Sequence, residues 1–303
     1  MYFTGFADEA ANDLAGQISA TRELGWNAIE SRRIDGVNLH DLSEEAFDRV
    51  RGQLRDSGVV VNCFGSAIAN WAKQIHDPDT ASQAETTRCI ARMQALGTTL
   101  VRVMSYAVRK DASGQPMADQ MDHERFRRLR EMTRRFRDAG LTPVHENCMN
   151  YGGMGASFTR RLLAEVPGLS LVFDTGNPTH SDDMDAVPGR DGMRPKQDGF
   201  AFYRAVRDHV AYVHIKDGRV GPDGTHAHTW PGEGAGAVRE ILRDLFARGY
   251  DGGISIEPHL AVVHHDPSLT SPAAIMRANY IAYGRRTMAL VAEARSPSGT
   301  RVP

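Results

Sequence analysis

The chain alternates between short apolar runs and longer segments whose apolar residues recur at helical spacing. Eight of these runs have the length and the β-branched or aromatic content of buried strands: Tyr2–Phe6, Ala28–Glu30, Val59–Phe64, Leu100–Met104, Thr142–Glu146, Leu169–Asp174, Val210–Ile215 and Gly253–Glu257. The segments that follow them predict helices over Leu14–Leu24, Glu44–Ser57, Ala81–Leu96, Glu124–Ala139, Phe158–Glu165, Phe200–Asp208, Val238–Arg248 and Ala273–Glu293. This alternation predicts parallel strands joined by right-handed crossovers, and eight repeats favour a closed barrel.

Glycines support these boundaries, because several predicted helices end in Gly shortly before the next strand. Gly accepts the left-handed conformation that closes a helix, and it stands at Gly25, Gly58, Gly97, Gly140 and Gly249. The expected fold is therefore α/β, with a single (β/α)₈ TIM barrel over residues 1–294 and a disordered tail over 295–303.

An open doubly wound sheet is the main alternative fold. Such a sheet should carry a phosphate-binding fingerprint after its first strand, and the segment Thr4–Asp8 is not one. A Gly-rich segment, Gly232–Gly236, follows no strand directly and lacks the Lys-Ser/Thr pair of a phosphate loop. We interpret it as a tight turn that leads into the seventh helix.

Composition excludes several classes of protein. Of 303 residues, 41% are hydrophobic and 24% charged, which is ordinary for a globular protein with a large core. No apolar stretch is long enough to span a bilayer, and the N-terminus lacks the basic and apolar regions of a signal peptide. The net charge of −2 gives no footprint for nucleic acid, and three unpaired cysteines fit a reducing compartment. We expect a cytoplasmic protein that binds neither membrane nor nucleic acid.

Four consecutive predicted strands end in a potential metal ligand: Glu146, Asp174, His214 and Glu257. The carboxyl ends of barrel strands meet at one rim, so these side chains can converge on a single cation. A carboxylate-rich set with one imidazole suits Mn²⁺, and alternatively Mg²⁺ or Co²⁺, better than a structural Zn²⁺ site. The alternative, that these residues only satisfy loop amides, is disfavoured because burying three carboxylates together without a cation is costly.

Three residues beside this set have two interpretations each. His145 faces the opposite side of a regular strand from Glu146, so it serves as a proton shuttle only if the strand breaks there; otherwise it is hydrogen-bonded behind the barrel. Lys216 shares the inward face of His214 and either holds a substrate oxygen or forms a structural ion pair. Cys148 is either a softer ligand or, as we prefer, a packing residue.

Loops after the strands supply further polar and aromatic side chains. Tryptophan faces commonly pack against sugar rings, although a single tryptophan is more often a packing anchor. His264 and His265 are expected to be solvated. The expected substrate contacts are Trp71, Asn177, His180, Lys216, His226, His228 and His259.

Five motifs together resemble the xylose isomerase-like barrel superfamily: Val144-His145-Glu146-Asn147, Phe173-Asp174-Thr175-Gly176-Asn177, Val213-His214-Ile215-Lys216-Asp217, Pro231-Gly232-Glu233-Gly234 and Ile256-Glu257-Pro258-His259. The resemblance covers nearly the whole chain and includes sugar isomerases and epimerases, inosose dehydratase and endonuclease IV-type repair enzymes. It implies that Glu146, Asp174, His214 and Glu257 bind one catalytic metal, usually Mn²⁺. In the epimerase branch the two glutamates also act as acid and base, and the position of Asn177 is commonly His.

The adjacent His145-Glu146 pair and the His214-x-Lys216-Asp217 strand most resemble inosose dehydratases and the catalytic subunits of C-glycoside deglycosidases. This resemblance implies a lyase that removes a proton α to a sugar ketone and eliminates the aglycone from 3-keto-glycosides. Ketose isomerase or epimerase and inosose-type dehydratase are the alternatives. The expected catalytic residues are His145, Glu146, Lys216 and Glu257. Expected partners are a small-molecule sugar or keto-glycoside and a smaller β subunit, in an oligomer. DNA repair is disfavoured, since it requires a multi-zinc cluster and a basic face.

Overall fold

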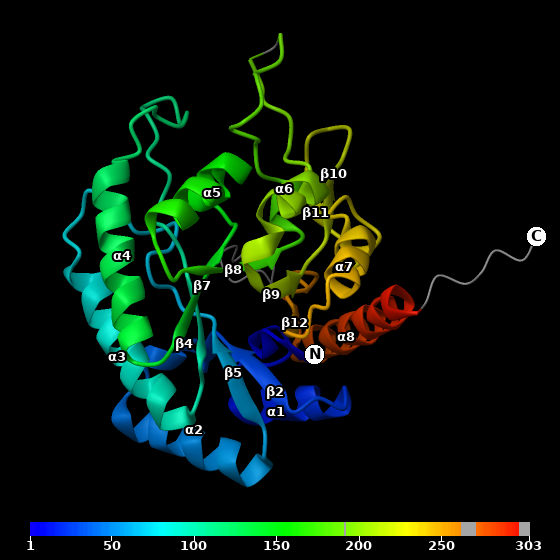
Figure 1. Cartoon of the computed structure of the whole chain (residues 1–303). Helices are drawn as coiled ribbons and strands as arrows, with labels where there is room; N and C mark the ends of the chain where they lie inside the picture. Colours follow the sequence, from blue (N-terminus) through cyan, green and yellow to red (C-terminus); the bar gives the residue numbers. More distant parts are fainter. Residues whose placement is uncertain (191, 262–270, 297–303) are drawn as a thin grey trace, which may run out of the picture.

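Eight parallel strands form the barrel in the computed structural model, which describes residues 1–190, 192–261 and 271–296. Their order around the sheet is β1-β12-β9-β8-β7-β6-β5-β2, and a bridge between Phe6 and Glu30 joins its two edges into a nearly closed barrel (Figure 1). The predicted fold class is confirmed. The strands are β1 (Tyr2–Gly5), β2 (Ala28–Ser31), β5 (Val60–Phe64), β6 (Leu100–Val103), β7 (Thr142–Glu146), β8 (Ser170–Asp174), β9 (Val210–Ile215) and β12 (Gly253–Ile256).

Each predicted helix is present and lies outside the strands (Figure 1). The helices are α1 (Leu14–Glu23), α2 (Glu44–Ser57), α3 (Thr80–Leu96), α4 (Asp122–Asp138), α5 (Ala156–Glu165), α6 (Gly199–Val206), α7 (Val238–Ala247) and α8 (Ala273–Arg295). Helix α8 includes Arg295, where we expected the tail to begin. Residues 297–303 of that tail, together with His264 and His265, lie outside the described residues. None of the described helices is both long and apolar enough to cross a membrane.

Glycines close the helices as expected. Gly58 and Gly97 cap α2 and α3 with φ of 67° and 69°, and Gly140 and Gly249 follow α4 and α7 with φ of 77° and 79°. A residue with a β-carbon would be strained in this left-handed conformation.

Two short hairpins at the carboxyl ends of strands were not predicted. One is β3 (Arg33–Ile34) with β4 (Val37–Asn38), and the other is β10 (Gly218–Val220) with β11 (His226–His228). Strands of two or three residues are too short to show the period-two alternation by which strands are recognised. The second hairpin brings His226 and His228 over the mouth of the barrel.

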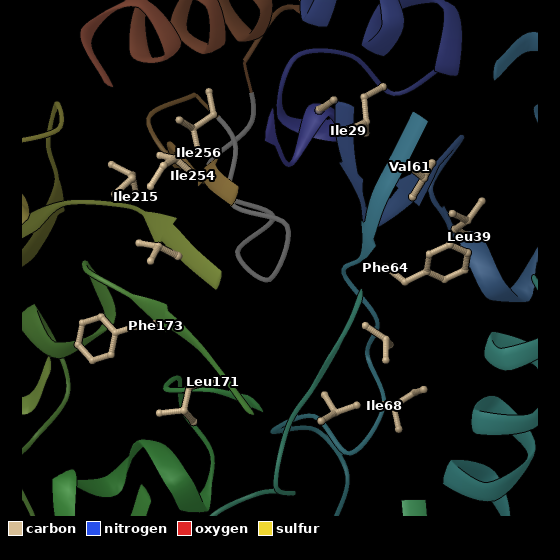
Figure 2. Close-up of a cluster of buried hydrophobic side chains, with 14 of the residues drawn as sticks. Ile29, Leu39, Val61, Phe64, Ile68, Leu171, Phe173, Ile215, Ile254 and Ile256 are labelled. Carbon is tan, nitrogen blue, oxygen red and sulfur yellow. The ribbon is translucent and has the colours of Figure 1, made fainter. Parts of the chain in front are cut away.

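Side-chain alternation along the strands separates an outer core from the barrel interior. Outward-facing residues such as Phe173 and Ile256 pack against the helices in the main apolar cluster (Figure 2). Val144, Val172 and Tyr212 form a separate cluster with Cys63. The first three precede Glu146, Asp174 and His214 by two residues each, so they lie on the same face. The predicted ligands therefore form the next layer of the barrel interior, toward its carboxyl rim.

Candidate metal centre

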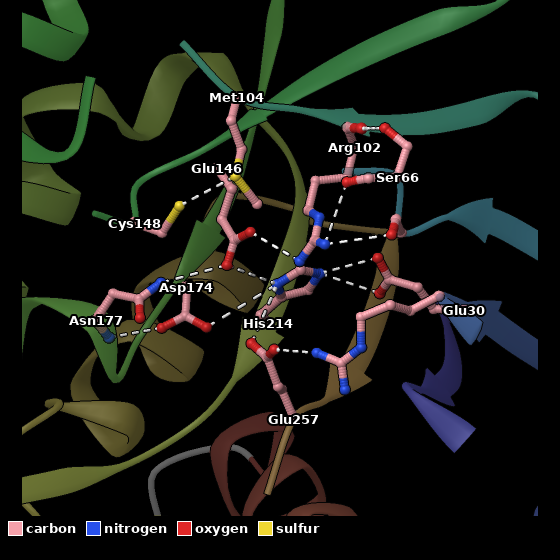
Figure 3. A network of polar contacts seen from close by, with 12 residues as sticks. Glu30, Ser66, Arg102, Met104, Glu146, Cys148, Asp174, Asn177, His214 and Glu257 are labelled. Atoms are coloured by element: carbon pink, nitrogen blue, oxygen red, sulfur yellow. Dashed lines mark hydrogen bonds and ion pairs between the residues drawn. The ribbon is translucent and has the colours of Figure 1, made fainter. Parts of the chain in front are cut away.

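The four predicted metal ligands converge, which confirms the central geometric expectation. Glu146 and Asp174 end β7 and β8, His214 lies in β9, and Glu257 directly follows β12 (Figure 3). Each offers one ligand atom, these atoms all lie within 4.8 Å of one another, and all four residues are buried. A small shift of these side chains would bring the atoms to the distances of roughly 2.0–2.6 Å from a common ion that direct coordination requires.

The imidazole of His214 is oriented for coordination. Its Nε2 lies 3.0 and 3.2 Å from the two carboxylate oxygens of Glu30, which accept its N–H. Its Nδ1 has no hydrogen-bond partner in the described part of the chain. That nitrogen lies 3.6 Å from Glu146 Oε1, 3.9 Å from Asp174 Oδ2 and 3.9 Å from Glu257 Oε2. A buried nitrogen without a partner, surrounded by three carboxylates, is a donor set that fits a divalent cation.

Lys216 compensates part of this negative charge. Its Nζ lies 2.9 Å from Glu257 Oε2 and 3.1 Å from Asp174 Oδ2. Burial lowers the pKa of the lysine, but the carboxylates around it, Asp174 first, outweigh burial and raise that pKa above its usual value. The residue lies on the inward face, as predicted, and the structure shows the predicted ion pair. A contact with substrate stays a prediction.

Two arginines, the buried Arg102 and the partly buried Arg32, hold the outer oxygens of the glutamates, and the sequence interpretation missed both. Arg102 Nη1 lies 3.0 Å from Glu146 Oε2, and Arg32 Nη1 lies 3.0 Å from Glu257 Oε1. Burial raises the pKa of Glu146, but Arg102 outweighs this and holds the pKa at about 2. Likewise burial raises the pKa of Glu257, but Lys216, with Arg32 contributing, holds it well below its usual value. Each glutamate is therefore ionised and turns its other oxygen toward the centre.

Asp174 differs from the two glutamates because no arginine contacts it among the described residues. Burial raises the pKa of Asp174 to about 7, although Lys216 lowers it. Its Oδ1 accepts the backbone N–H groups of Gly176 and Asn177 at 2.9 and 2.6 Å. These bonds fix the carboxylate, so that Oδ2 faces the centre.

The interpretation of His145 as a proton shuttle is wrong on geometry. Strand β7 stays regular through Glu146, so His145 points to the opposite side, behind the barrel. Its Nε2 lies 3.0 Å from Ser105 Oγ and 3.1 Å from Asn150 Oδ1. Burial lowers the pKa of His145 to about 4, and the residue does not line the pocket above the centre.

A cavity of about 530 Å³ opens above the four ligands. All the predicted substrate contacts line it, together with Arg32, Arg33, Arg102, Met104 and Met149, which we did not predict. Trp71 is 37% exposed, so its ring is accessible at the mouth rather than a packing anchor in the core. Asn177 also donates to Glu146 Oε1 at 3.3 Å, so it holds a proposed ligand as well as lining the cavity.

Imidazoles form one side of this cavity. The ring centroids of His180 and His226 lie 4.5 Å apart, those of His226 and His228 4.7 Å, and those of His228 and His259 5.0 Å. Burial lowers the pKa of His228 to about 2 and that of His259 to about 4. The rings of His228 and His259 are therefore neutral at pH 7 and can both donate to and accept from hydroxyl groups.

Cys148 is a packing residue, as we preferred. Its Sγ lies 3.6 Å from Met104 Sδ and accepts from Asn150 Nδ2 at 2.9 Å. It is not a member of the group of ligand atoms that converge on the centre.

The Gly-rich segment is a tight turn into α7, as interpreted. The carboxylate of Asp217 accepts four backbone N–H groups at 2.9–3.0 Å, from Gly218, Gly232, Gly234 and Gly236. A β-carbon at Gly234 would lie 2.3 Å from Asp217 Oδ1, so no larger residue fits there without movement. Ala235 N also donates to Gly218 O, which fastens this turn to the β10–β11 hairpin.

Three residues that contact the ligands were absent from the sequence predictions: Glu30, Arg32 and Arg102. Glu30 ends the second predicted strand, so applying the strand-end rule to every strand would have found it. Arg102 lies inside the predicted fourth strand, and Arg32 lies two residues after Glu30. Their pairing with carboxylates from distant strands has no local signal.

Comparison with known proteins places the chain in a family. The sequence model of the xylose isomerase-like TIM barrel family matches residues 18–284. The chain therefore belongs to the xylose isomerase-like TIM barrel family. No curated protein matched.

Solved structures agree on the fold. A xylose isomerase-like TIM barrel protein from Mycobacterium smegmatis in complex with magnesium is 17% identical, with a TM-score of 0.65 over 91% of this chain and 89% of that one. The D-psicose 3-epimerase of Clostridium cellulolyticum H10, solved with D-tagatose, is 16% identical, with a TM-score of 0.69 over 96% and 99%. A 3-keto-D-glucoside 4-epimerase from E. coli is 15% identical, with a TM-score of 0.60 over 94% and 99%.

Proposed function

We propose that this protein is a divalent-metal-dependent carbohydrate enzyme that removes a proton α to a sugar ketone, and specifically a lyase that eliminates the aglycone from 3-keto-glycosides. The observation that carries the proposal is the convergence of Glu146, Asp174 and Glu257 on the unpaired Nδ1 of His214, beneath a cavity lined by neutral imidazoles. The epimerases among the similar structures, one of them named for a 3-keto-glucoside, support a sugar ketone as substrate.

A bound Mn²⁺, or Mg²⁺ or Co²⁺, would supply the Lewis acid that stabilises negative charge on the carbonyl oxygen. Glu146, Asp174, His214 and Glu257 would hold it. The ammonium of Lys216 lies 2.9 Å from Glu257 Oε2. From there it can also donate a hydrogen bond to the carbonyl oxygen of the substrate. The protein's own contribution at this end of the substrate is therefore the fixed ammonium group of Lys216.

His259 takes the role of base in this proposal, in place of His145. It is neutral and lines the cavity, and its Nε2 lies 3.3 Å from Glu257 Oε1 and 3.5 Å from Glu9 Oε1. The two carboxylates accept the Nε2 proton, so Nδ1 is the nitrogen that takes the proton from carbon, and the same carboxylates then stabilise the imidazolium. The C–H electron pair then forms the carbon–carbon double bond as the bond to the leaving group breaks. The leaving group departs with the electron pair of the bond that breaks and takes up the proton that His259 releases.

The arginines favour elimination over epimerisation. An epimerase that uses two glutamates as acid and base must protonate each of them in turn. Arg102 and Arg32 oppose this, because Arg102 holds one oxygen of Glu146 and Arg32 holds one oxygen of Glu257 in an ion pair. Elimination needs no glutamate to become protonated.

The test is product analysis with 3-keto-glycosides in D₂O, using protein loaded with Mn²⁺. Release of the aglycone supports the lyase, whereas an isomeric sugar that retains solvent deuterium supports an epimerase. The assay is run on the protein alone and with a candidate smaller subunit, since we also propose a partner of that kind and an oligomer. Metal binding without deuterium exchange or product from any keto sugar would contradict the proposed chemistry.

A further inference from the structure

We infer that Glu30 is a positioning residue that sets the proton and the ring orientation of His214, and thereby the affinity of the centre for its metal. The inference rests on the proposed function, since it assumes that a cation binds there. Glu30 is fully buried at the end of β2, on the opposite side of His214 from the three carboxylates (Figure 3).

The place of the Glu30 carboxylate is fixed without help from His214. Ser255 Oγ donates to Glu30 Oε2 at 2.6 Å, and Tyr212 OH donates to the same oxygen at 3.0 Å. Asn62 Nδ2 in turn donates to Tyr212 OH at 3.0 Å. These donors come from β12, β9 and β5, so the barrel wall itself holds Glu30. The carboxylate is therefore a rigid reference point for the imidazole.

This arrangement determines which nitrogen of His214 is available. A carboxylate only accepts hydrogen bonds, so the contacts of 3.0 and 3.2 Å place the ring proton on Nε2. The nitrogen left for a cation is therefore Nδ1, which faces Glu146, Asp174 and Glu257. The rings of Phe6 and Tyr212 pack edge-on against the imidazole, with ring centroids 5.1 and 5.6 Å from its own, and restrict its rotation. Histidines that bind metals commonly depend on such a carboxylate partner.

The test compares Mn²⁺ affinity in two variants of the same network. Glu30→Gln removes the charge that receives the His214 N–H, and Tyr212→Phe removes another Glu30 partner but leaves that bond intact. We expect Glu30→Gln to weaken Mn²⁺ binding about 10–100-fold, measured by the EPR signal of free Mn²⁺, and Tyr212→Phe to stay close to the wild-type protein. Equal affinity of Glu30→Gln and wild type, or equal weakening in both variants, would overturn the inference.

A second measurement needs no variant, in case Glu30→Gln does not fold. Histidine labelled with ¹⁵N in the wild-type protein reports the tautomer of His214 by long-range ¹H–¹⁵N correlation, before and after Mg²⁺ is added. We expect the proton on Nε2 and a shift of the Nδ1 resonance on adding Mg²⁺. A proton on Nδ1 in the Mg²⁺-bound protein would overturn the inference. Wild-type protein that binds no metal at all would instead refute the proposed function, so the two failures are distinguishable.

Discussion

His145 and Glu146 are neighbours in strand β7, but their side chains lie on opposite sides of the barrel wall. Glu146 faces the centre, 3.6 Å from His214 Nδ1, whereas His145 contacts Ser105 and Asn150 behind the strand. Sequence adjacency within a regular strand therefore separates two side chains that a motif would place in one site.

The variant His145→Leu should lose stability but not metal. Removing the imidazole deletes one hydrogen-bond partner of Ser105 and Asn150, which keep their bond of 2.6 Å to each other, so it should cost roughly 0.5–1.5 kcal/mol in the free energy of unfolding. Mn²⁺ affinity and turnover of the folded variant should remain. In the matched variant His259→Gln, turnover should be lost while Mn²⁺ still binds. Loss of turnover in folded His145→Leu with activity kept in His259→Gln would reverse our assignment of the base.

The ion pair between Arg102 and Glu146 predicts a large effect on stability. Arg102→Met leaves the buried carboxylate of Glu146 without its cation, so the metal-free protein should lose about 3–5 kcal/mol in urea unfolding. Added Mn²⁺ should restore part of the loss, because it compensates the same carboxylate. Arg49→Met is the control, since its exposed pair with Glu45 should be worth less than about 1 kcal/mol. Equal losses in the two variants would show that burial of the first pair is unimportant.

The four hydrogen bonds to Asp217 predict that this residue holds the β10–β11 hairpin in place. Asp217→Asn replaces one accepting oxygen by a donor facing backbone N–H groups, and Gly234→Ala introduces a β-carbon where Asp217 lies. Both should speed amide hydrogen exchange over residues 218–236 and raise KM more than they lower kcat. Gly52→Ala is the matched control, because a β-carbon added at this position in helix α2 would meet nothing within 4 Å. This variant should stabilise the folded protein by about 0.5–1 kcal/mol. Unchanged exchange in the first two variants would rule out this role for Asp217.

Acid should destabilise the protein through His40, which is remote from the metal centre. Burial lowers the pKa of His40 from 6.5 to about 4. The unfolded chain therefore binds the proton more readily than the folded one, and stability falls as the pH decreases from about 6.5 to 4. The contribution of this residue is at most about 3 kcal/mol. Urea unfolding against pH should show a shallower decline in His40→Leu than in the wild-type protein; parallel curves would contradict it.

The sequence predicted the features that depend on local pattern. Asp174 and Glu257 were identified because each ends a recognisable strand, and the barrel topology then places strand ends together. Arg102 was missed because its role depends on Glu146 in a neighbouring strand, and a buried arginine within a strand has no local signature. His145 was placed in the site on the condition that β7 breaks at its end, but the strand stays regular through Glu146. The β10–β11 hairpin was missed because its strands are only three residues long.

The central claim is that one divalent cation binds where the four strand ends meet. Equilibrium dialysis against Mn²⁺, followed by metal analysis, tests it in wild type and in Asp174→Asn. In this variant Oδ1 keeps its bonds to Gly176 and Asn177, while the oxygen facing the centre is replaced. We predict one Mn²⁺ per wild-type chain and at least about 10-fold weaker binding in the variant. Wild-type protein without bound Mn²⁺, or a variant that binds it equally well, would contradict the account.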